Sequence, residues 1–547
     1  MAEAFLGVDV GTGSARAGLF DKGGRLLAAA RREIRIWRED PNIVEQSSDD
    51  IWRAICESVR AALAAAGLAG EDVKGLGFDA TCSLVVLDRA ERPLTVSPSG
   101  AKERNVIVWM DHRALEQTAC INATNHAVLR YVGGRISPEM QTPKLLWLKE
   151  NLPQTFHAAG DFFDLADYLS FRATGSRARS ACTLTCKWTY LAHERRFDAD
   201  YFRTIGLGEL ADEGFARIGT QVVDVATPLG AGLTEAAAND LGLVAGTPVG
   251  ASLIDAHAGG VGTVGGATSD HAAVDPTREL AFIMGTSSCT MTLTREPVFV
   301  DGVWGPYYGA MIPGTWLLEG GQSAYGAALD YLVTLHPAFA AAKADAANEG
   351  VSVLDLLERR AVAMAGSLEA AALLGAELII VPEFLGNRSP EADPHARAAI
   401  SGMTLAASEE SLIRLFVAAL CGLCYGTRQI VEANRAKGLE LGTIVASGGA
   451  SRSALLRQIL ADATGLTVTL PQTPEPVLLG SAMIGAVARG AHDDLSAAAL
   501  AMCRIGAVTR PTEGPIAAFH AAKFTAYEAL QRCERQTRAL IEPYVKR

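Results

Sequence analysis

A glycine-rich turn near the start of the sequence contains the first residues that could do chemistry. In the segment GVDVGTGSARAGLFD, Gly11 and Gly13 let the backbone bend with few steric limits. Thr12 and Ser14 supply hydroxyl groups, and Arg16 supplies a positive charge. Backbone amides exposed by such a turn can hold a phosphate group. Taken alone, the turn is more typical of an ordinary hairpin, so it predicts phosphate binding only with further support.

A second turn of similar composition gives that support. Gly285, Thr286 and Ser287 separate two apolar strands that we expect at residues 280–284 and 289–294. The order of strand, Gly-Thr-small turn and strand repeats the order near the N-terminus, which indicates two related domains. Two such hairpins that face each other across a cleft would hold a polyphosphate between them.

Two aspartates lie where a strand ends. Asp9 is at the end of the strand expected over residues 4–10, where it could hold a divalent cation through water. Asp255 follows the strand expected over residues 247–254 and precedes an Ala/Gly-rich helix. A carboxylate there is well placed as a general base for a substrate hydroxyl, although an N-cap role is about as frequent for this spacing. We interpret His257 as a packed polar residue.

A third small-residue turn lies later in the chain. Gly448, Gly449 and Ala450 follow the strand expected over residues 443–447 and precede the helix expected over residues 451–465. Small residues let a flat ring lie against the backbone, and a helix N-terminus favours anions. A tight strand-to-helix connection explains the same pattern without any ligand.

Other motifs are interpreted as structural. Gly260, Gly262 and Gly265 spell the dinucleotide fingerprint GxGxxG, but they fall inside a helical region and no acidic residue follows at the required distance. This Gly/Ala face is more typical of close helix packing. The CxxC of Cys421 and Cys424 lies in an apolar helical run, which favours buried thiols over zinc or redox chemistry. We expect no structural metal, and the P-loop and protein-kinase signatures are absent from the sequence.

The surrounding elements must position these residues in two domains, 1–270 and 271–547, with a boundary near residue 270 in a polar stretch. The first domain would hold the candidate base Asp255 and the first hairpin, and the second domain would hold the other two turns. Hydrophobic periodicity predicts strands at residues 4–10, 15–20, 26–36, 75–79 and 84–88, and helices at residues 49–66, 141–151 and 411–436.

Composition excludes several classes of protein. The chain has 547 residues, of which 49% are hydrophobic and 20% are charged, and this composition is globular. A net charge of −12 disfavours nucleic-acid binding through the overall field. We expect no signal peptide and no membrane span, because no basic leader and no stretch of 18 uncharged apolar residues occurs. The ten scattered cysteines indicate a cytoplasmic protein with reduced thiols.

The four elements around residues 7–21, 252–266, 285–288 and 444–465, in this order, resemble the FGGY carbohydrate kinases. The segment PEFLGNRSPEADPHARAAISG adds to this resemblance, which covers essentially the whole chain. It implies an α/β fold with two ribonuclease-H-like domains of the actin-like ATPase group and a central cleft. It also implies ATP and Mg²⁺ as cofactors and phosphoryl transfer to a sugar or polyol hydroxyl.

The resemblance assigns roles residue by residue. Asp255 matches the general base, and Asp9 matches the acid near magnesium, with Asp255 beside it. The two phosphate hairpins match Gly11, Thr12, Gly13, Ser14 and Arg16, and Gly285, Thr286 and Ser287. The adenosine loop matches Gly448, Gly449 and Ala450.

The substrate side is similar to the ribulokinase-like branch. Thr81 and Cys82 stand where glycerol kinases usually have an Arg-Glu pair and xylulokinases a Met-His pair, and the string TCSLV resembles the D-ribulokinase subgroup. Lys187 and Glu319 match positions that contact ribulose in L-ribulokinases, although without the resemblance Lys187 would be interpreted as a solvated strand lysine. The substrate-binding candidates are Thr81, Cys82, Ser83, Trp109, Asp111, Glu139, Lys187, Asp255 and Glu319.

The resulting hypothesis is an ATP-dependent kinase for the terminal hydroxyl of a ketopentose, converting D-ribulose to D-ribulose 5-phosphate. Ribitol, xylulose and L-ribulose remain alternative substrates. A nicotinamide-dependent oxidoreductase and a non-catalytic sugar sensor are alternatives of other classes, but a sensor would normally lose the base or a phosphate turn. The expected partners are a sugar and ATP, and a homodimer stays open.

Overall fold

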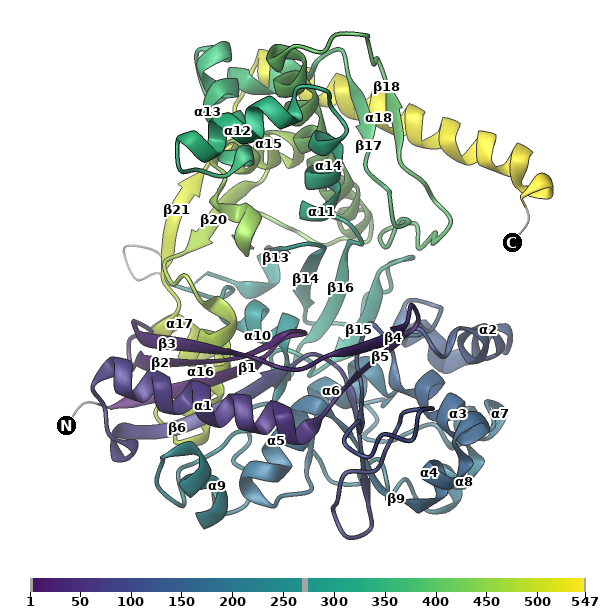
Figure 1. Ribbon diagram of the computed structural model, residues 1–547, viewed down its shortest axis with the longest axis vertical. Coiled ribbons are helices and arrows are strands. Elements are labelled where there is room, and N and C mark those ends of the chain that lie inside the picture. Colours follow the sequence, from purple (N-terminus) through teal and green to yellow (C-terminus); the bar gives the residue numbers. More distant parts are fainter. Residues whose placement is uncertain (1–2, 268–273, 546–547) are drawn as a thin grey trace.

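The computed structural model describes residues 3–267 and 274–545, which form two lobes (Figure 1). The lower lobe is built on a sheet of order β3-β2-β1-β6-β12. Its strands are β1 (Ala4–Val10), β2 (Ser14–Asp21), β3 (Leu26–Glu33), β6 (Val73–Ala80) and β12 (Leu253–Ile254). Strands β1, β2 and β3 are antiparallel, whereas β6 and β12 continue the sheet in parallel with β1.

The upper lobe repeats this arrangement. Within the order β15-β16-β14-β13-β19-β20-β21, strands β16, β14 and β13 are antiparallel, and β19 and β20 continue in parallel with β13. The strands are β13 (Glu279–Met284), β14 (Ser288–Thr294), β15 (Trp304–Tyr308), β16 (Trp316–Gln322), β19 (Thr443–Ser447), β20 (Thr467–Pro471) and β21 (Ile505–Thr509). The predicted α/β fold with two ribonuclease-H-like halves is confirmed.

A third sheet extends the lower lobe. Its order is β4-β5-β8-β7-β9, formed by β4 (Trp37–Asp40), β5 (Ile43–Gln46), β7 (Leu84–Asp88), β8 (Val106–Ile107) and β9 (Ala159–Asp164). The segments that enter and leave β7 and β8 contain Cys82 and Trp109, so this sheet positions one wall of the site. The described chain also contains the short pairs β10 (Arg179–Ser180) with β11 (Val222–Val223) and β17 (Ile379–Val381) with β18 (Ala399–Ser401).

Amphipathic helices cover the sheets. Helix α1 (Ser48–Ala66) buries Ile51, Ile55 and Val59 along one face, and Ser47 caps its first turn by accepting a hydrogen bond from the Asp50 amide. The other α-helices of the lower lobe within residues 3–267 are α2 (Leu115–Ala123), α3 (Gln141–Asn151), α4 (Pro153–Ala158), α5 (Leu165–Thr174), α6 (Ala181–Lys187), α7 (Ala199–Thr204), α8 (Gly208–Asp212), α9 (Glu235–Leu241) and α10 (Asp255–Val261).

Helix α14 (Glu409–Ala436) runs through the core of the upper lobe. It is long and apolar enough to cross a membrane, but 83% of its most apolar window is buried inside the protein, so it is a core helix. Cys421 and Cys424 lie on it as buried free thiols, as the sequence predicts. Around it lie α11 (Gly326–Thr334), α12 (Phe339–Asn348), α13 (Val353–Ala365), α15 (Ala454–Thr464) and α18 (Pro515–Ile541).

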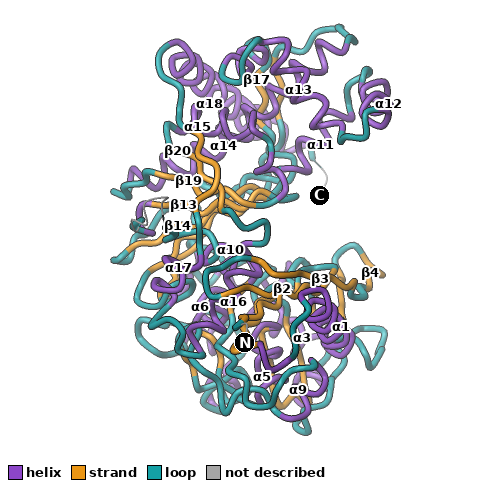
Figure 2. Tube along the Cα trace, turned by 90° about the vertical axis from the view of Figure 1, so that its left-hand side faces the viewer, coloured by secondary structure: helices purple, strands orange, loops and turns teal. Residues whose placement is uncertain are grey.

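Helix α16 (Pro476–Ala488) comes late in the chain yet packs on the sheet of the lower lobe, with α17 (Leu495–Met502) beside it (Figures 1 and 2). The contact needs glycine: a Cβ on Gly7 would lie 1.9 Å from the Leu478 carbonyl oxygen, and one on Gly262 would lie 1.9 Å from the Pro476 oxygen. Gly262 therefore serves helix packing, as predicted. The boundary predicted near residue 270 lies outside the described residues.

Three predicted elements differ from the structure in their bounds. The strand expected over residues 26–36 ends at Glu33. The strand expected over residues 247–254 is reduced to Leu253–Ile254, because Pro248 has no amide hydrogen and the backbone before β12 pairs with Leu76 only irregularly. The helix expected from residue 451 begins at Ala454, since Ser453 caps it and a short 3-10 turn, Gly449–Arg452, comes first.

Candidate active site

Three carboxylates come together where β1, β6 and β12 end. Asp9 on β1 pairs in register with Asp79 on β6, and Leu253 on β12 pairs with Asp79 from the other side, so Asp255 follows directly. Asp79 is fully buried; Ser481 donates a hydrogen bond to one of its oxygens, and Oδ1 has no partner within the described residues. Burial and the charge of Asp9 raise the pKa of Asp79 well above its usual range.

A cavity of about 480 Å³ between the two lobes opens onto two of these carboxylates, Asp9 and Asp255. Most of the predicted site residues line it: Asp9, Gly11, Thr12, Ser14, Arg16, Thr81, Cys82, Trp109, Glu139, Lys187, Asp255, Gly285, Thr286, Ser287 and Glu319. Residues from hairpins, helices and strands of both halves thus share one space, which has the size of a small-molecule site.

The cavity also contains residues that sequence reasoning missed. Cys289, Trp304 and Arg388 line it from the upper lobe. Arg388 lies within the quoted segment PEFLGNRSP, so the family resemblance could have pointed to it. Asp79 likewise lies two residues before the string TCSLV, where a carboxylate beside a strand end is a usable signal. Nothing in the sequence around Trp304 distinguishes it from a core residue.

Asp255 is the first residue of α10, and Ile254 occupies the N-cap position. Its Oδ1 accepts a hydrogen bond from the Ala256 amide at 2.8 Å, while the half-buried side chain lines the cavity. Burial, followed by the charge of Asp9, raises the pKa of Asp255 to about 6. A carboxylate with this pKa is ionised at neutral pH and still basic enough to accept a proton.

The two glycine turns face the same cavity, as predicted. In the first turn, Trp109 donates an indole hydrogen bond to Thr12 Oγ1 at 2.9 Å, which ties the turn to the third sheet. Arg16 is engaged by the protein, because Nε contacts Asp9 Oδ2 at 2.6 Å and Nη1 contacts Glu475 Oε2 at 2.8 Å. Arg16 therefore links β2 to the start of α16. Gly13 does not line the cavity, and its carbonyl accepts a hydrogen bond from the Ile34 amide.

Lys187 and Glu319 form a charged part of the cavity wall. Lys187 ends helix α6 and is buried, so it is not a solvated strand lysine. Burial alone would lower the pKa of Lys187, but Cys82 and Glu319 outweigh it and raise the pKa. Burial alone would raise the pKa of Glu319, but Lys187 and His257 lower it to about 2. Both groups are therefore charged at neutral pH.

His257 connects Glu319 to the lower lobe. Its Nε2 lies 3.4 Å from Glu319 Oε2, and its Nδ1 lies 3.1 Å from Cys182 Sγ. All three side chains are buried. His257 is a packed polar residue, as predicted, and it fixes the orientation of a residue that lines the cavity.

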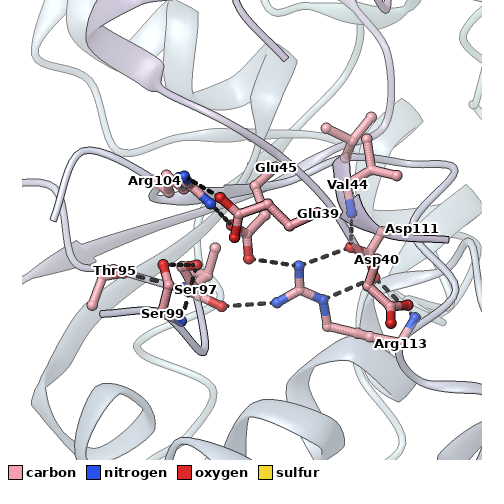
Figure 3. A network of polar contacts seen from close by, with 12 residues as sticks. Glu39, Asp40, Val44, Glu45, Thr95, Ser97, Ser99, Arg104, Asp111 and Arg113 are labelled. Atoms are coloured by element: carbon pink, nitrogen blue, oxygen red, sulfur yellow. Dashed lines mark hydrogen bonds and ion pairs between the residues drawn. The ribbon is translucent and has the colours of Figure 1, made fainter. Parts of the chain in front are cut away.

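Asp111 and Ser83 are not part of the cavity wall. The Asp111 carboxylate accepts two hydrogen bonds from the Arg113 guanidinium, at 2.8 Å each, one from the Arg113 amide at 3.0 Å and one from the Val44 amide at 2.6 Å. Figure 3 shows this network, in which Arg113 also reaches Glu45 at 3.0 Å. We expected the Asp111 carboxylate to contact a sugar. In this structure it is paired instead with Arg113, two residues further along the chain. Ser83 is buried and contacts Thr81 and the Trp109 amide.

The predicted adenosine loop lies next to the second hairpin but outside the cavity lining. Gly448 has a φ of 87°, and a Cβ on it would lie 2.6 Å from the carbonyl oxygen of Met284. Gly285 follows Met284 directly, so the loop of Gly448, Gly449 and Ala450 lies beside the start of the second glycine turn.

Comparisons with known proteins agree with this geometry. The N-terminal domain of the FGGY family of carbohydrate kinases matches residues 4–262, and the C-terminal domain matches residues 280–489. An FGGY carbohydrate kinase domain-containing protein of Homo sapiens is 45% identical over 93% of this chain and 92% of its own. A D-ribulokinase of Saccharomyces cerevisiae is 39% identical over 89% of this chain and 72% of its own.

The fold has solved counterparts at low sequence identity. A glycerol kinase of Plasmodium falciparum, solved with ADP, superimposes with a TM-score of 0.76 at 16% identity and covers 97% of this chain and 98% of its own. The two-lobe architecture is thus that of known sugar kinases. The chain belongs to the FGGY family of carbohydrate kinases, phosphotransferases that use ATP.

Proposed function

We propose that this kinase transfers the γ-phosphoryl group of ATP to the terminal hydroxyl of a ketopentose, and that its substrate is D-ribulose. The observation that carries the proposal is the Asp255 carboxylate, which faces one cavity together with both glycine turns, Lys187 and Glu319. The relative from Saccharomyces cerevisiae supports the choice of D-ribulose, because its identity to this chain extends over most of the sequence.

The residues divide the chemistry between them. Asp255 accepts the proton of the attacking hydroxyl, and the amides of the turns at Gly11 and Gly285, with Thr12 and Thr286, stabilise charge on the transferred phosphoryl group. Such a transfer needs little covalent help, so positioning and electrostatics supply most of the acceleration.

The carboxylates fit a magnesium ion. Asp9 and Asp255 present oxygens to the cavity. Oxygen donors of this kind suit Mg²⁺, which usually keeps several waters and binds through one or two carboxylates and the substrate phosphates. When bound, the ion would neutralise charge on the terminal phosphates. Arg16 keeps one Asp9 oxygen engaged, so the other oxygen is available to a metal-bound water.

The part of the cavity wall formed by Lys187, Glu139 and Glu319 combines a group that only donates hydrogen bonds with groups that accept them. Lys187 donates hydrogen bonds, whereas the side-chain oxygens of Glu139 and Glu319 accept them. Polyhydroxylated sugars offer both partners. A lost or inverted hydroxyl would leave one of these charged groups unpaired, which gives strong selection between epimers.

The test is an ATP-consumption assay over D-ribulose, L-ribulose, D-xylulose, L-xylulose and ribitol. We expect the highest kcat/KM for D-ribulose, with D-ribulose 5-phosphate as the product by mass spectrometry and NMR. A higher kcat/KM for any other member of the panel would overturn D-ribulose as the substrate. NAD-dependent turnover without ATP consumption would overturn the kinase proposal, although the close contact of Gly262 with α16 leaves no room there for a dinucleotide.

Activity should fall in acid because the base must be ionised. With the pKa of Asp255 raised to about 6, kcat/KM for the sugar should be constant above about pH 7 and fall about tenfold per pH unit below about pH 6. The measurement is kcat/KM from pH 5 to pH 8 with saturating ATP and Mg²⁺, and circular dichroism at each pH controls for unfolding. A profile that is flat down to pH 5 would contradict this role of Asp255.

We place the kinase in the cytoplasm, where ATP is available. The ten cysteines all lie within the described residues as free thiols, which fits a reducing compartment.

A further inference from the structure

Arg388 reaches the cavity from a loop of the upper lobe. The loop connects β17 to β18, and Figure 1 shows this connection descending from the upper lobe toward β15 and β16. The guanidinium carbon of Arg388 lies 5.6 Å from the ring centroid of Trp304 on β15. Arg388 and Trp304 both line the cavity that contains Asp255 and Lys187.

The guanidinium of Arg388 has few hydrogen-bond partners in the described part of the protein. Within the described residues its one hydrogen bond is a weak contact from Nη1 to Cys289 Sγ at 4.0 Å. Arginine has five N–H donors and no acceptor, so most of its donors have no protein partner. Burial alone would lower the pKa of Arg388, but Cys289, Glu139 and Glu319 raise it and keep the group charged. A charged donor that faces the cavity with most of its N–H groups unpartnered by the protein can donate them to acceptor oxygens of a ligand.

We propose that Arg388 donates hydrogen bonds to oxygens of the sugar, and that helix α18 holds Arg388 in place from outside the cavity. This inference rests on the proposed function and adds a substrate contact from the upper lobe.

The loop around Arg388 is built on Asn387 and Glu383. Asn387 Nδ2 donates to Glu383 Oε1 at 2.5 Å, and Asn387 Oδ1 accepts from the Glu391 amide at 3.0 Å. Gln531 on α18 also donates to Glu383 Oε1, at 2.6 Å. Asn387, Glu383 and Gln531 are buried. The residue next to Arg388 is thus fixed by a buried network that ends on α18.

Two ion pairs extend this contact. Arg535 Nη1 lies 3.2 Å from Glu391 Oε2, and Arg538 pairs with Asp393. Gln531, Arg535 and Arg538 are four and three residues apart, so they lie on one face of α18. The helix therefore contacts the loop along two of its turns.

The opposite side of the loop is held by the connection before β15. Ser389 Oγ donates to the Gly302 carbonyl at 3.0 Å, and a Cβ on Gly302 would lie 1.7 Å from the Pro390 oxygen. Arg388 is thus held between α18 and this connection. The family match ends at residue 489, so α18 lies beyond the part of the chain that the match covers.

The first experiment measures the sugar contact. In the full-length protein, Arg388→Ala should raise KM for D-ribulose by about 10–100-fold, the effect of losing hydrogen bonds from a charged donor, while KM for ATP changes less than twofold. Arg388→Lys should recover only part of this loss, because lysine lacks the planar fork. Arg397→Ala, on the exposed part of the same loop, is the matched control and should leave both KM values unchanged. An unchanged KM for D-ribulose in Arg388→Ala would overturn the proposal.

The second experiment measures positioning by α18. The double variant Arg535→Ala/Arg538→Ala should raise KM for D-ribulose by about 2–10-fold, the range for two partly exposed ion pairs, without changing KM for ATP. Arg532→Ala, which removes an exposed arginine of the same helix, is the control. Combined with Arg388→Ala, the double variant should add no further increase, because it acts through Arg388. A full additive increase, or no increase in either background, would overturn the positioning role of α18.

Failure of this inference and failure of the proposed function give different results. If the unmodified kinase prefers another sugar of the panel, only D-ribulose is overturned, and the same variants are measured with the preferred sugar. If the kinase phosphorylates a sugar while Arg388→Ala leaves its KM unchanged, only the inference about Arg388 fails. Thermal midpoints within 2 °C of the unmodified protein show that each variant is folded.

Discussion

Asp255→Asn is expected to lower kcat by about 10²–10⁴-fold, which corresponds to roughly 3–5 kcal/mol of barrier. The substitution keeps the shape of the side chain, and the amide oxygen can still accept the hydrogen bond from Ala256. It removes the carboxylate charge, and with it the ability to take a proton from the sugar hydroxyl. Binding of ATP, measured by calorimetry, should change little because the two glycine turns are untouched.

The matched control is Asp493→Asn, an exposed aspartate for which kcat should stay within twofold. Single-turnover kinetics would locate the loss in the chemical step, since a defect in product release leaves the first turnover fast. Near-normal kcat in Asp255→Asn would reject this residue as the base, and a loss of folding, seen as a lowered thermal midpoint, would assign it a structural role.

Gly262→Ala should destabilise the protein by about 3 kcal/mol, the upper part of the range for overpacking a rigid site. The φ of −74° at Gly262 suits alanine, so the expected loss is steric. The added Cβ would lie 1.9 Å from the Pro476 oxygen and 3.0 Å from the Gly480 nitrogen, and both are backbone atoms that cannot rotate away. Urea denaturation followed by tryptophan fluorescence measures the free energy of unfolding.

Gly442→Ala is the control for this experiment. A Cβ at Gly442 would have no neighbour within 4 Å, so the free energy of unfolding should change by less than about 0.5 kcal/mol. Equal stability of the two variants would mean that α10 and α16 are not in close contact in solution. A variant Gly262→Ala that unfolds earlier but retains ATP turnover would also separate this glycine from any cofactor-binding role.

Local patterns account for the parts of the fold that the sequence predicted well. The hairpins at β1–β2 and β13–β14 need only alternating apolar residues and small residues between them, and both form where expected. Helix α1 follows from its apolar spacing and from the polar residues at its start. The order of the two hairpins and the other motifs along the chain then pointed to the family, because the same hairpin occurs once in each half.

Partners that are distant in sequence account for the rest. From the sequence, the side chain of Asp111 is expected to be free to bind a sugar. In the structure its carboxylate accepts hydrogen bonds from the Val44 amide, in β5, and from Arg113. Arg16 was expected to serve phosphate, yet its second partner is Glu475, 459 residues away. Neither contact has a periodic signal. Arg388 was missed for the same reason, since its contacts with Cys289 and Trp304 depend on how the upper lobe is assembled.

The position of α16 on the opposite lobe has a consequence for biosynthesis. On a ribosome, residues 4–267 emerge long before Pro476–Ala488, so the face of the first sheet that carries Gly7, Gly75 and Gly77 has no cover until nearly the whole polypeptide has been made. An N-terminal lobe expressed without α16 would therefore have an exposed apolar face and would be prone to chaperone binding and aggregation. The halves are duplicated in architecture, but they mature as one cooperative unit.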